Sequence, residues 1–250
     1  MRSRIFAKRN FTEILRDPVS YIFGLGFPII MLIIMTVINQ SIPPEAGMKI
    51  FDIENLSCGM AVFSLSFTML CAAMLVSKDR AGAFLQRLYS SPMRPAEFIA
   101  GYLLPLLAVA FLQVIITFIS SAVICLITGE NLRFSGVMFA IVSLLPAAVT
   151  FVSLGIAIGF LLGEKSAPPA CSIIISASGL LGGIWFDCKS VGGAFLAVCR
   201  ALPFLNAVDL SRGAIAGNAN VLLPFLIICG YAVLSLAFAI FAFTLKRKTN

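Results

Sequence analysis

The sequence predicts an all-α polytopic membrane protein with six transmembrane helices. Hydrophobic residues make up 60% of the 250 residues and charged residues only 12%, whereas soluble domains carry about twice that share of charge. Six apolar stretches without Asp, Glu, Lys or Arg are each long enough to cross roughly 30 Å of hydrocarbon. Backbone groups in lipid must be hydrogen-bonded within their own segment, so each stretch is expected to be a helix. The predicted spans are 19–38, 56–77, 98–128, 136–163, 167–186 and 221–245.

Residues 1–18 predict an amphipathic helix that lies on the inner membrane surface and ends at Asp17-Pro18. Its apolar residues recur at helical spacing, with basic and acidic residues roughly opposite. The alternative is a positively charged flank that merely orients the first span. No continuous apolar core precedes residue 19, so a cleavable signal peptide is not expected. The apolar positions are Ala7, Phe11, Ile14, Leu15 and Pro18.

The distribution of Lys and Arg predicts the orientation. Thirteen of the eighteen fall in residues 1–18, the loop 78–97, the turn 164–166 and the tail 246–250. The positive-inside rule therefore places both termini and these loops in the cytoplasm. The net charge of +7 has the same origin and does not require a nucleic acid partner.

Two connecting segments are not ordinary polar loops. Residues 78–89 have helical periodicity and predict a short cytosolic amphipathic helix, which either lies against lipid headgroups or docks a cytosolic partner. In the outer segment 187–220, the apolar stretch 191–205 is broken by glycines and Pro203. It predicts one or two short helices that dip back into the membrane, and a flexible apolar loop on the surface is the alternative.

Small residues and cysteines leave two further alternatives open. Glycines at four-residue spacing allow close helix packing, either within the chain or between two copies; they are Gly155, Gly159 and Gly163, and Gly179 and Gly183. Cys188 and Cys199 share the outer segment, so they either form a disulfide or are two buried apolar side chains.

Several chemistries lack the residues they need. The chain has no histidine and no C-x-x-C spacing, so a zinc, haem or Cys-His site has few ligands to draw on. No phosphate-binding G-x-x-x-x-G-K-S/T loop is present, so this chain is not expected to hydrolyse ATP. The predicted spans also lack the charged residue that ion-coupled transporters use. We therefore expect a non-enzymatic chain with no cofactor of its own.

Two motifs resemble those of the type-2 ATP-binding-cassette permeases. The stretch "KDRAGAFLQRLYSSPMRPAEFIAGYLLP" resembles the family's cytoplasmic loop, and "LPFLNAVDLSRGAIAG" resembles its Pro-rich segment before the last span. The matching positions are Asp79-Arg80, Gly82, Leu85, Leu88, Ser91-Pro92 and Gly101 in the first motif, and Pro203, Asn206 and Arg212 in the second. The amphipathic N-terminal helix, the six spans and the cytosolic termini extend the resemblance over nearly the whole chain.

The resemblance implies a single permease domain over 1–250 of an exporter in the bacterial inner membrane. Two copies, expected to be identical, would pair with two cytosolic ATPase subunits that bind ATP and Mg. Residues 1–18 would be a connecting helix, and residues 78–97 would carry a coupling helix that docks on the ATPase. The implied coupling residues are Asp79, Arg80, Gly82, Phe84, Leu85, Arg87 and Leu88.

The resemblance also implies a path between the two copies, faced by spans two and five and closed on the outside by the dipping segment. Path candidates are Phe63, Ser64, Phe67, Ile174 and Ser178, and gate candidates are Pro203, Asn206 and Arg212. An uncharged lining favours an amphipathic or hydrophobic substrate, such as a drug, an antibiotic peptide or a lipid-like molecule. The alternatives are a secondary transporter or channel that works without an ATPase, and a scaffold that recruits an ATPase without moving a substrate.

Overall fold

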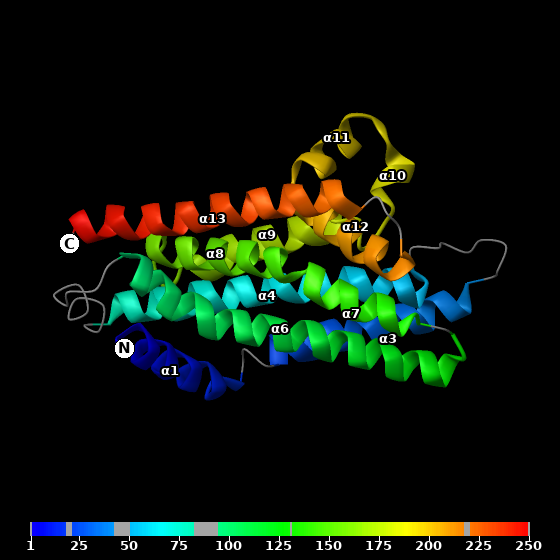
Figure 1. The fold of residues 1–250 in the computed structure, drawn as a ribbon, viewed down its shortest axis with the longest axis horizontal. Coiled ribbons are helices and arrows are strands. Elements are labelled where there is room, and N and C mark those ends of the chain that lie inside the picture. Colours follow the sequence, from blue (N-terminus) through cyan, green and yellow to red (C-terminus); the bar gives the residue numbers. More distant parts are fainter. Residues whose placement is uncertain are drawn as a thin grey trace.

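A computed structural model describes residues 2–18, 22–42, 51–82, 95–130, 132–217 and 221–249. These ranges are helical throughout, without a β-strand (Figure 1). In chain order the elements are α1 (Arg2–Leu15), the π-helix η1 (Ile22–Gly26), α3 (Phe27–Ser41), α4 (Ile53–Ala81), α6 (Pro95–Thr128), α7 (Phe134–Ser143), α8 (Leu145–Leu161), α9 (Ala167–Leu181), α10 (Cys188–Val191), α11 (Gly193–Ala201), α12 (Pro203–Ala216) and α13 (Leu222–Thr249).

Five segments of the described chain are long and apolar enough to cross a membrane. They are η1 with α3, α4, α6, α7 with α8, and α13. The pair α11 and α12 is bent by 83° and forms either a broken span or a re-entrant loop. This confirms the predicted all-α membrane class, and the bent pair lies where the dipping segment before the last span is predicted.

The fifth predicted span, 167–186, is shorter in the structure than expected. Helix α9 has 15 residues and ends at Leu181, which covers roughly 22 Å at 1.5 Å per residue. The backbone turns at Gly182 and Gly183, and Gly183 has φ +65°, a left-handed conformation that favours glycine. The sequence pattern suggests a packing role for Gly179 and Gly183, and the structure shows that Gly183 lies in the turn after the helix.

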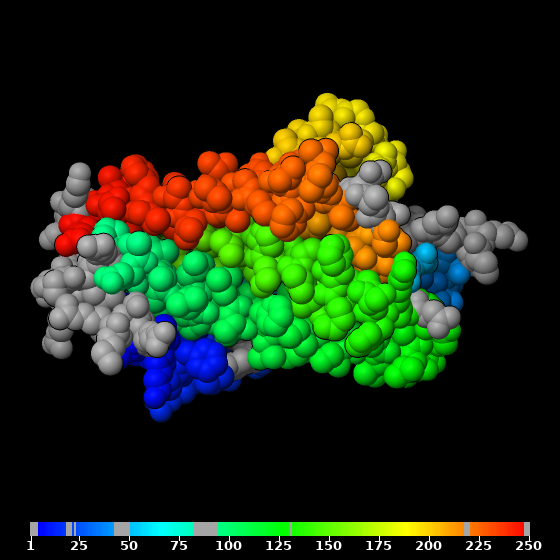
Figure 2. Space-filling model, in the orientation of Figure 1, coloured from blue at the N-terminus to red at the C-terminus, as the bar shows by residue number. Residues whose placement is uncertain are grey.

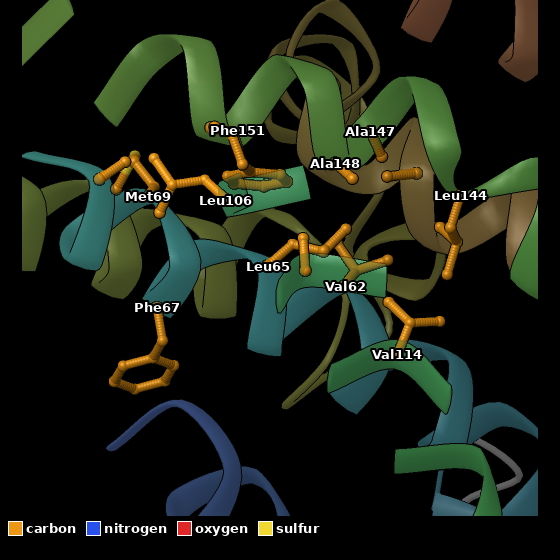
Figure 3. Packing of buried hydrophobic residues seen from close by; sticks show 14 of the residues in the cluster. Val62, Leu65, Phe67, Met69, Leu106, Val114, Leu144, Ala147, Ala148 and Phe151 are labelled. Carbon is orange, nitrogen blue, oxygen red and sulfur yellow. The ribbon is translucent and has the colours of Figure 1, made fainter. Parts of the chain in front are cut away.

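Helix α4 is the central element of the bundle. In its most apolar window 83% of the residues are buried, compared with 22% for α3 and for α13. It packs against α8, α6 and α9, and α13 covers the other face of α8 (Figure 1). In Figure 3, side chains from α4, α6 and α8 meet in one apolar core that includes Leu65, Leu106 and Phe151. The many exposed Leu, Ile and Phe side chains of α3 and α13 form faces suited to lipid.

Glycines allow α8 to lie directly against α4. A Cβ atom on Gly155 would collide with the carbonyl oxygen of Met69, and one on Gly159 would lie 2.7 Å from the carbonyl oxygen of Ala73. The structure thus places these two glycines at a contact within the chain, as small residues in membrane helices often are. A Cβ atom added to Gly163, the third of the series, would meet no atom within 4 Å.

Helix α1 lies against the start of α6, at the end of the bundle that also holds the end of α4 and the C-terminal end of α13 (Figure 1). It projects from the body of the bundle, as the α10–α11 segment does near the opposite end (Figure 2). Phe6, Asn10 and Ile14 are buried, whereas Phe11 and Leu15 are 39% and 54% exposed. The predicted amphipathic helix is therefore present, and part of its apolar face packs on protein while Phe11 and Leu15 stay exposed.

Candidate functional site

The end of α4 carries a buried carboxylate, Asp79, which is held by two other helices. Its side chain is 3% exposed. From α1, the Arg9 guanidinium donates two hydrogen bonds to the two carboxylate oxygens, at 2.6 and 2.8 Å. From α6, the Tyr102 hydroxyl donates to Oδ2 at 2.7 Å. A buried charge is costly unless it is paired and hydrogen-bonded. Here the Arg9 guanidinium pairs with the carboxylate through two hydrogen bonds, and the Tyr102 hydroxyl supplies a third.

Arg9 belongs to a wider ion network at the surface. It also pairs with Glu13 at 2.7 Å, and Glu13 contacts the Lys78 ammonium at 3.3 Å. Burial lowers the pKa of Arg9, but the hydrogen bond and the charge of Asp79 outweigh that effect and raise the pKa above its ordinary value. Arg9 is therefore a permanent cation that links α1 to α4.

A second set of contacts fixes α1 on α6. The Asn10 side-chain amide is fully buried and donates to the Gly101 carbonyl at 3.0 Å. The Phe6 ring lies 4.8 Å from the Tyr102 ring and 5.3 Å from the Phe98 ring, centroid to centroid. A Cβ atom on Gly101 would collide with the Phe6 ring. The glycine that opens the third span in the motif thus makes room for α1.

Arg80 and Gly82 complete the end of α4. The Arg80 guanidinium donates to the carbonyl of Phe160 in α8, and the Gly82 N–H closes the helix on the Lys78 carbonyl at 3.1 Å. The predicted second span ends at residue 77, but the structure continues α4 to Ala81. Residues 78–81 are thus the last turn of α4 rather than part of a separate helix. The helix can continue through these charged residues because Asp79 and Arg80 are both bonded within the protein.

The structure does not describe the four remaining coupling candidates. Phe84, Leu85, Arg87 and Leu88 lie outside the described residues. They follow Gly82 directly in the chain, so the segment that holds them begins where α4 is tied to α1, α6 and α8.

The structure brings two of the path candidates together and separates the others. The rings of Phe63 and Phe67 lie 5.4 Å apart. Phe67 also contacts Phe27 of α3 at 5.4 Å, and Phe63 contacts Trp185 at 5.7 Å. In Figure 3, Phe67 points away from the α4–α8 core. The sequence reasoning missed Phe27 and Trp185, although Trp185 is the one tryptophan of the chain.

Neither serine among the path candidates lies in this aromatic group. The Ser64 hydroxyl donates to the Ala61 carbonyl of its own helix, at 2.7 Å. Ser178 is fully buried and shares a hydrogen bond of 2.9 Å with Ser66, so it joins α9 to α4. Ile174, also on α9, is partly buried and packs against the apolar core.

Two of the gate candidates form the bend between α11 and α12, and the third, Arg212, ties α12 to other elements. Pro203 occupies the first position of α12, where its fixed φ suits a helix start. The Asn206 amide donates to the carbonyls of Arg200 and Leu202, at 2.8 and 2.7 Å, and so caps the end of α11. Arg212 joins α12 to the carbonyls of Asn55 and Gly183, at 3.3 and 3.0 Å.

Cys188 and Cys199 lie in one small buried cluster with Leu205. Both side chains are fully buried, and both are free thiols in the structure. Among the described residues, no group of three or more Cys, Asp or Glu side chains could hold a metal ion.

Comparison with known proteins identifies the family. A family model described as "ABC-2 type transporter" matches residues 2–216. No curated protein matches the chain. The family match covers most of the sequence, from α1 to the end of α12, and so includes the Asp79 network and the bend between α11 and α12. The chain therefore belongs to the ABC-2 type transporter family, in which it is a membrane permease domain, a non-catalytic transmembrane component.

Proposed function

We propose that this chain is the permease subunit of an ATP-driven exporter, which moves an amphipathic or hydrophobic substrate outward. A separate cytosolic ATPase subunit, in two copies, binds ATP and Mg and supplies the energy. Two permease copies, taken as identical, form the membrane part. The complex lies in the bacterial inner membrane with the permease termini in the cytoplasm, in line with the excess of basic residues on that side.

The tied end of α4 is the observation that carries this proposal. Asp79 and Arg80 connect α4 to α1, α6 and α8 within the last turn before Gly82. A force applied to the segment after Gly82 therefore reaches three helices as well as α4. A loop that only joined two spans would not need a buried, doubly anchored carboxylate at its start.

The coupling role is assigned to residues 79–88 on this basis. Asp79 and Arg80 hold the base of the segment, and Gly82 ends α4. Phe84, Leu85 and Leu88 supply apolar docking contacts to the ATPase, and Arg87 supplies a charge. Helix α1 moves with α4 because Arg9 joins them.

The proposed substrate path and the proposed outer gate both lie at contacts with α4, the central helix of the bundle. The aromatic group of Phe27, Phe63, Phe67 and Trp185 packs uncharged side chains between α3, α4 and the turn after α9, and a path opened there would suit an apolar substrate. On the outer side, Arg212 fixes the re-entrant segment to the turn that follows α9. Movement of α4 or α9 would therefore be transmitted to that segment.

Transport in proteoliposomes tests this function. The permease and its co-purified ATPase are reconstituted, and movement of a fluorescent cationic amphiphile is followed with Mg and ATP, with Mg and a non-hydrolysable analogue, and with ATP in the absence of Mg. Movement that requires Mg and hydrolysis supports the exporter. Movement independent of ATP supports a lone transporter or channel, and hydrolysis without movement of any tested amphiphile supports a scaffold.

A further inference from the structure

A groove of about 1020 Å³ runs between α1 and the last turns of α4. Basic side chains line it, among them Lys8, Arg16 and Lys78. Its floor is apolar and is made by Cys71, Met74 and Leu75 of α4. Lys78 and Cys71 are seven residues apart, so the groove changes from charged to apolar over about 10 Å along the helix.

This change in polarity sets the chemistry of the occupant. The floor belongs to α4, a helix long and apolar enough to cross a membrane, and lies inward of Lys78 along it, at a depth where hydrocarbon is expected. A soluble protein surface does not reach such a depth, whereas an acyl chain does. An occupant with one polar end and an apolar tail fits both parts of the groove.

The charged side chains of the groove indicate that the polar end of the occupant is anionic. Lys78 is already paired with Glu13. Lys8 and Arg16 are exposed and form no ion pair with any residue that the structure describes. They stand eight residues apart, Lys8 on α1 and Arg16 directly after it, which is about 12 Å at the helical rise, so they bracket a headgroup rather than bind one oxygen. Three carboxylates, those of Glu13, Asp17 and Glu164, also line the groove, against the four basic side chains of Lys8, Arg9, Arg16 and Lys78, so the lining keeps a net positive charge.

We propose that this groove is a binding site for an anionic phospholipid from the leaflet on which α1 lies. The headgroup phosphate lies between Lys8 and Arg16, and an acyl chain covers Met74 and Leu75. Basic residues on a membrane-surface helix attract anionic lipids, and here the apolar floor adds a defined place for the chain. The lipid would brace α1 against α4 beside the Arg9–Asp79 pair.

Lipid retention by the permease chain tests this site and does not require the ATPase. The chain is purified in mild detergent containing equal amounts of phosphatidylglycerol and phosphatidylcholine, and bound lipids are counted by native mass spectrometry. The wild type should retain phosphatidylglycerol in preference. The double variant K8Q/R16Q should retain about tenfold less, and Glu164→Gln, which removes one of the three opposing carboxylates, should retain more.

Two matched controls separate the groove from general charge and hydrophobicity. The double variant K165Q/R247Q removes two exposed cations outside the groove and should retain phosphatidylglycerol as the wild type does. Met74→Trp fills the floor and should abolish retention, whereas Val233→Trp, on the exposed face of α13, should not. Thermal unfolding and gel-filtration profiles show that each variant is folded.

Three results would overturn the proposal. Equal retention of the two lipids, or equal loss in both double variants, would mean that no site selects the anionic headgroup. Loss of lipid retention in Met74→Trp but not in K8Q/R16Q would assign the groove to an uncharged amphiphile. Because retention is measured on the permease alone, each result stands whether or not an ATPase subunit co-purifies.

Discussion

Arg9 and Asp79 are seventy residues apart in the sequence, yet their side chains form a two-pronged ion pair at 2.6 and 2.8 Å. This pair joins a surface helix to the most buried span of the permease. Tyr102 binds the same carboxylate from a third helix. The three residues make the end of α4 a rigid junction, directly before the segment that the proposed ATPase contacts.

A double-mutant cycle measures how much this pair stabilises the fold. Asp79→Asn, Arg9→Gln and the double variant should show a coupling energy of about 1–3 kcal/mol, because a nearly buried carboxylate loses charged hydrogen bonds. Thermal unfolding can be followed with a thiol-reactive dye, since most cysteines are buried.

The exposed pair of Lys189 and Asp209 is the matched control. Its atoms lie 2.9 Å apart, but the lysine side chain is 52% exposed. The same cycle with Lys189→Gln and Asp209→Asn should give less than about 1 kcal/mol. Equal coupling energies at the two pairs would contradict a special role for Asp79.

A small residue at Gly155 is required by the contact between α8 and α4. Gly155→Ala should destabilise the protein by about 1–3 kcal/mol, because the new methyl group meets the Met69 backbone. Gly230→Ala in α13 is the control, since no atom lies within 4 Å of its added Cβ. There the change should be neutral or stabilise by roughly 0.5–1 kcal/mol. A harmless Gly155→Ala would show that the two helices do not pack so closely.

The fold class could be predicted from the sequence because apolar length and the absence of charge are local properties. Helix ends were less predictable, since they depend on tertiary contacts. Charged residues after 77 signal the end of a span, but internal pairing of Asp79 and Arg80 carries α4 on to Ala81. Gly183 fits a packing motif with Gly179, but in the structure it lies in the turn that follows α9.

The candidate site was predictable only in part, for the same reason. The motif identifies Asp79 but not its partners. The sequence pattern places Arg9 on the polar face of α1, but it does not indicate which residue of another helix Arg9 contacts. Likewise, Phe27 and Trp185 join Phe63 and Phe67 only through packing.

The outer segment should depend on the fork shape of Arg212. Arg212→Lys should lower the stability by about 1–2 kcal/mol, since one ammonium cannot replace two guanidinium contacts to the carbonyls of Asn55 and Gly183. Transport should fall while the ATPase subunit still co-purifies. Arg200→Lys, at an exposed position of α11, should change neither property. Loss of the ATPase in Arg212→Lys would argue against a role confined to the outer side.

All seven cysteines are free thiols in the structure. Alkylation of the denatured protein without reductant should therefore add seven groups, which intact-mass measurement can count. Cys188 and Cys199 should react only after denaturation, since both are fully buried. A protein that takes up two fewer groups until it is reduced would show that these two cysteines form a disulfide.

The central claim is that residues 79–88 hold an ATPase subunit. The most direct measurement is a mild-detergent pull-down of the tagged chain from its native host, with subunit ratios counted by mass spectrometry. We predict a roughly equimolar ATP-binding subunit, which is lost in Leu85→Asp and kept in Val191→Asp, a matched change at an exposed site of α10. A stable wild-type chain that purifies without any ATP-binding subunit would contradict the claim.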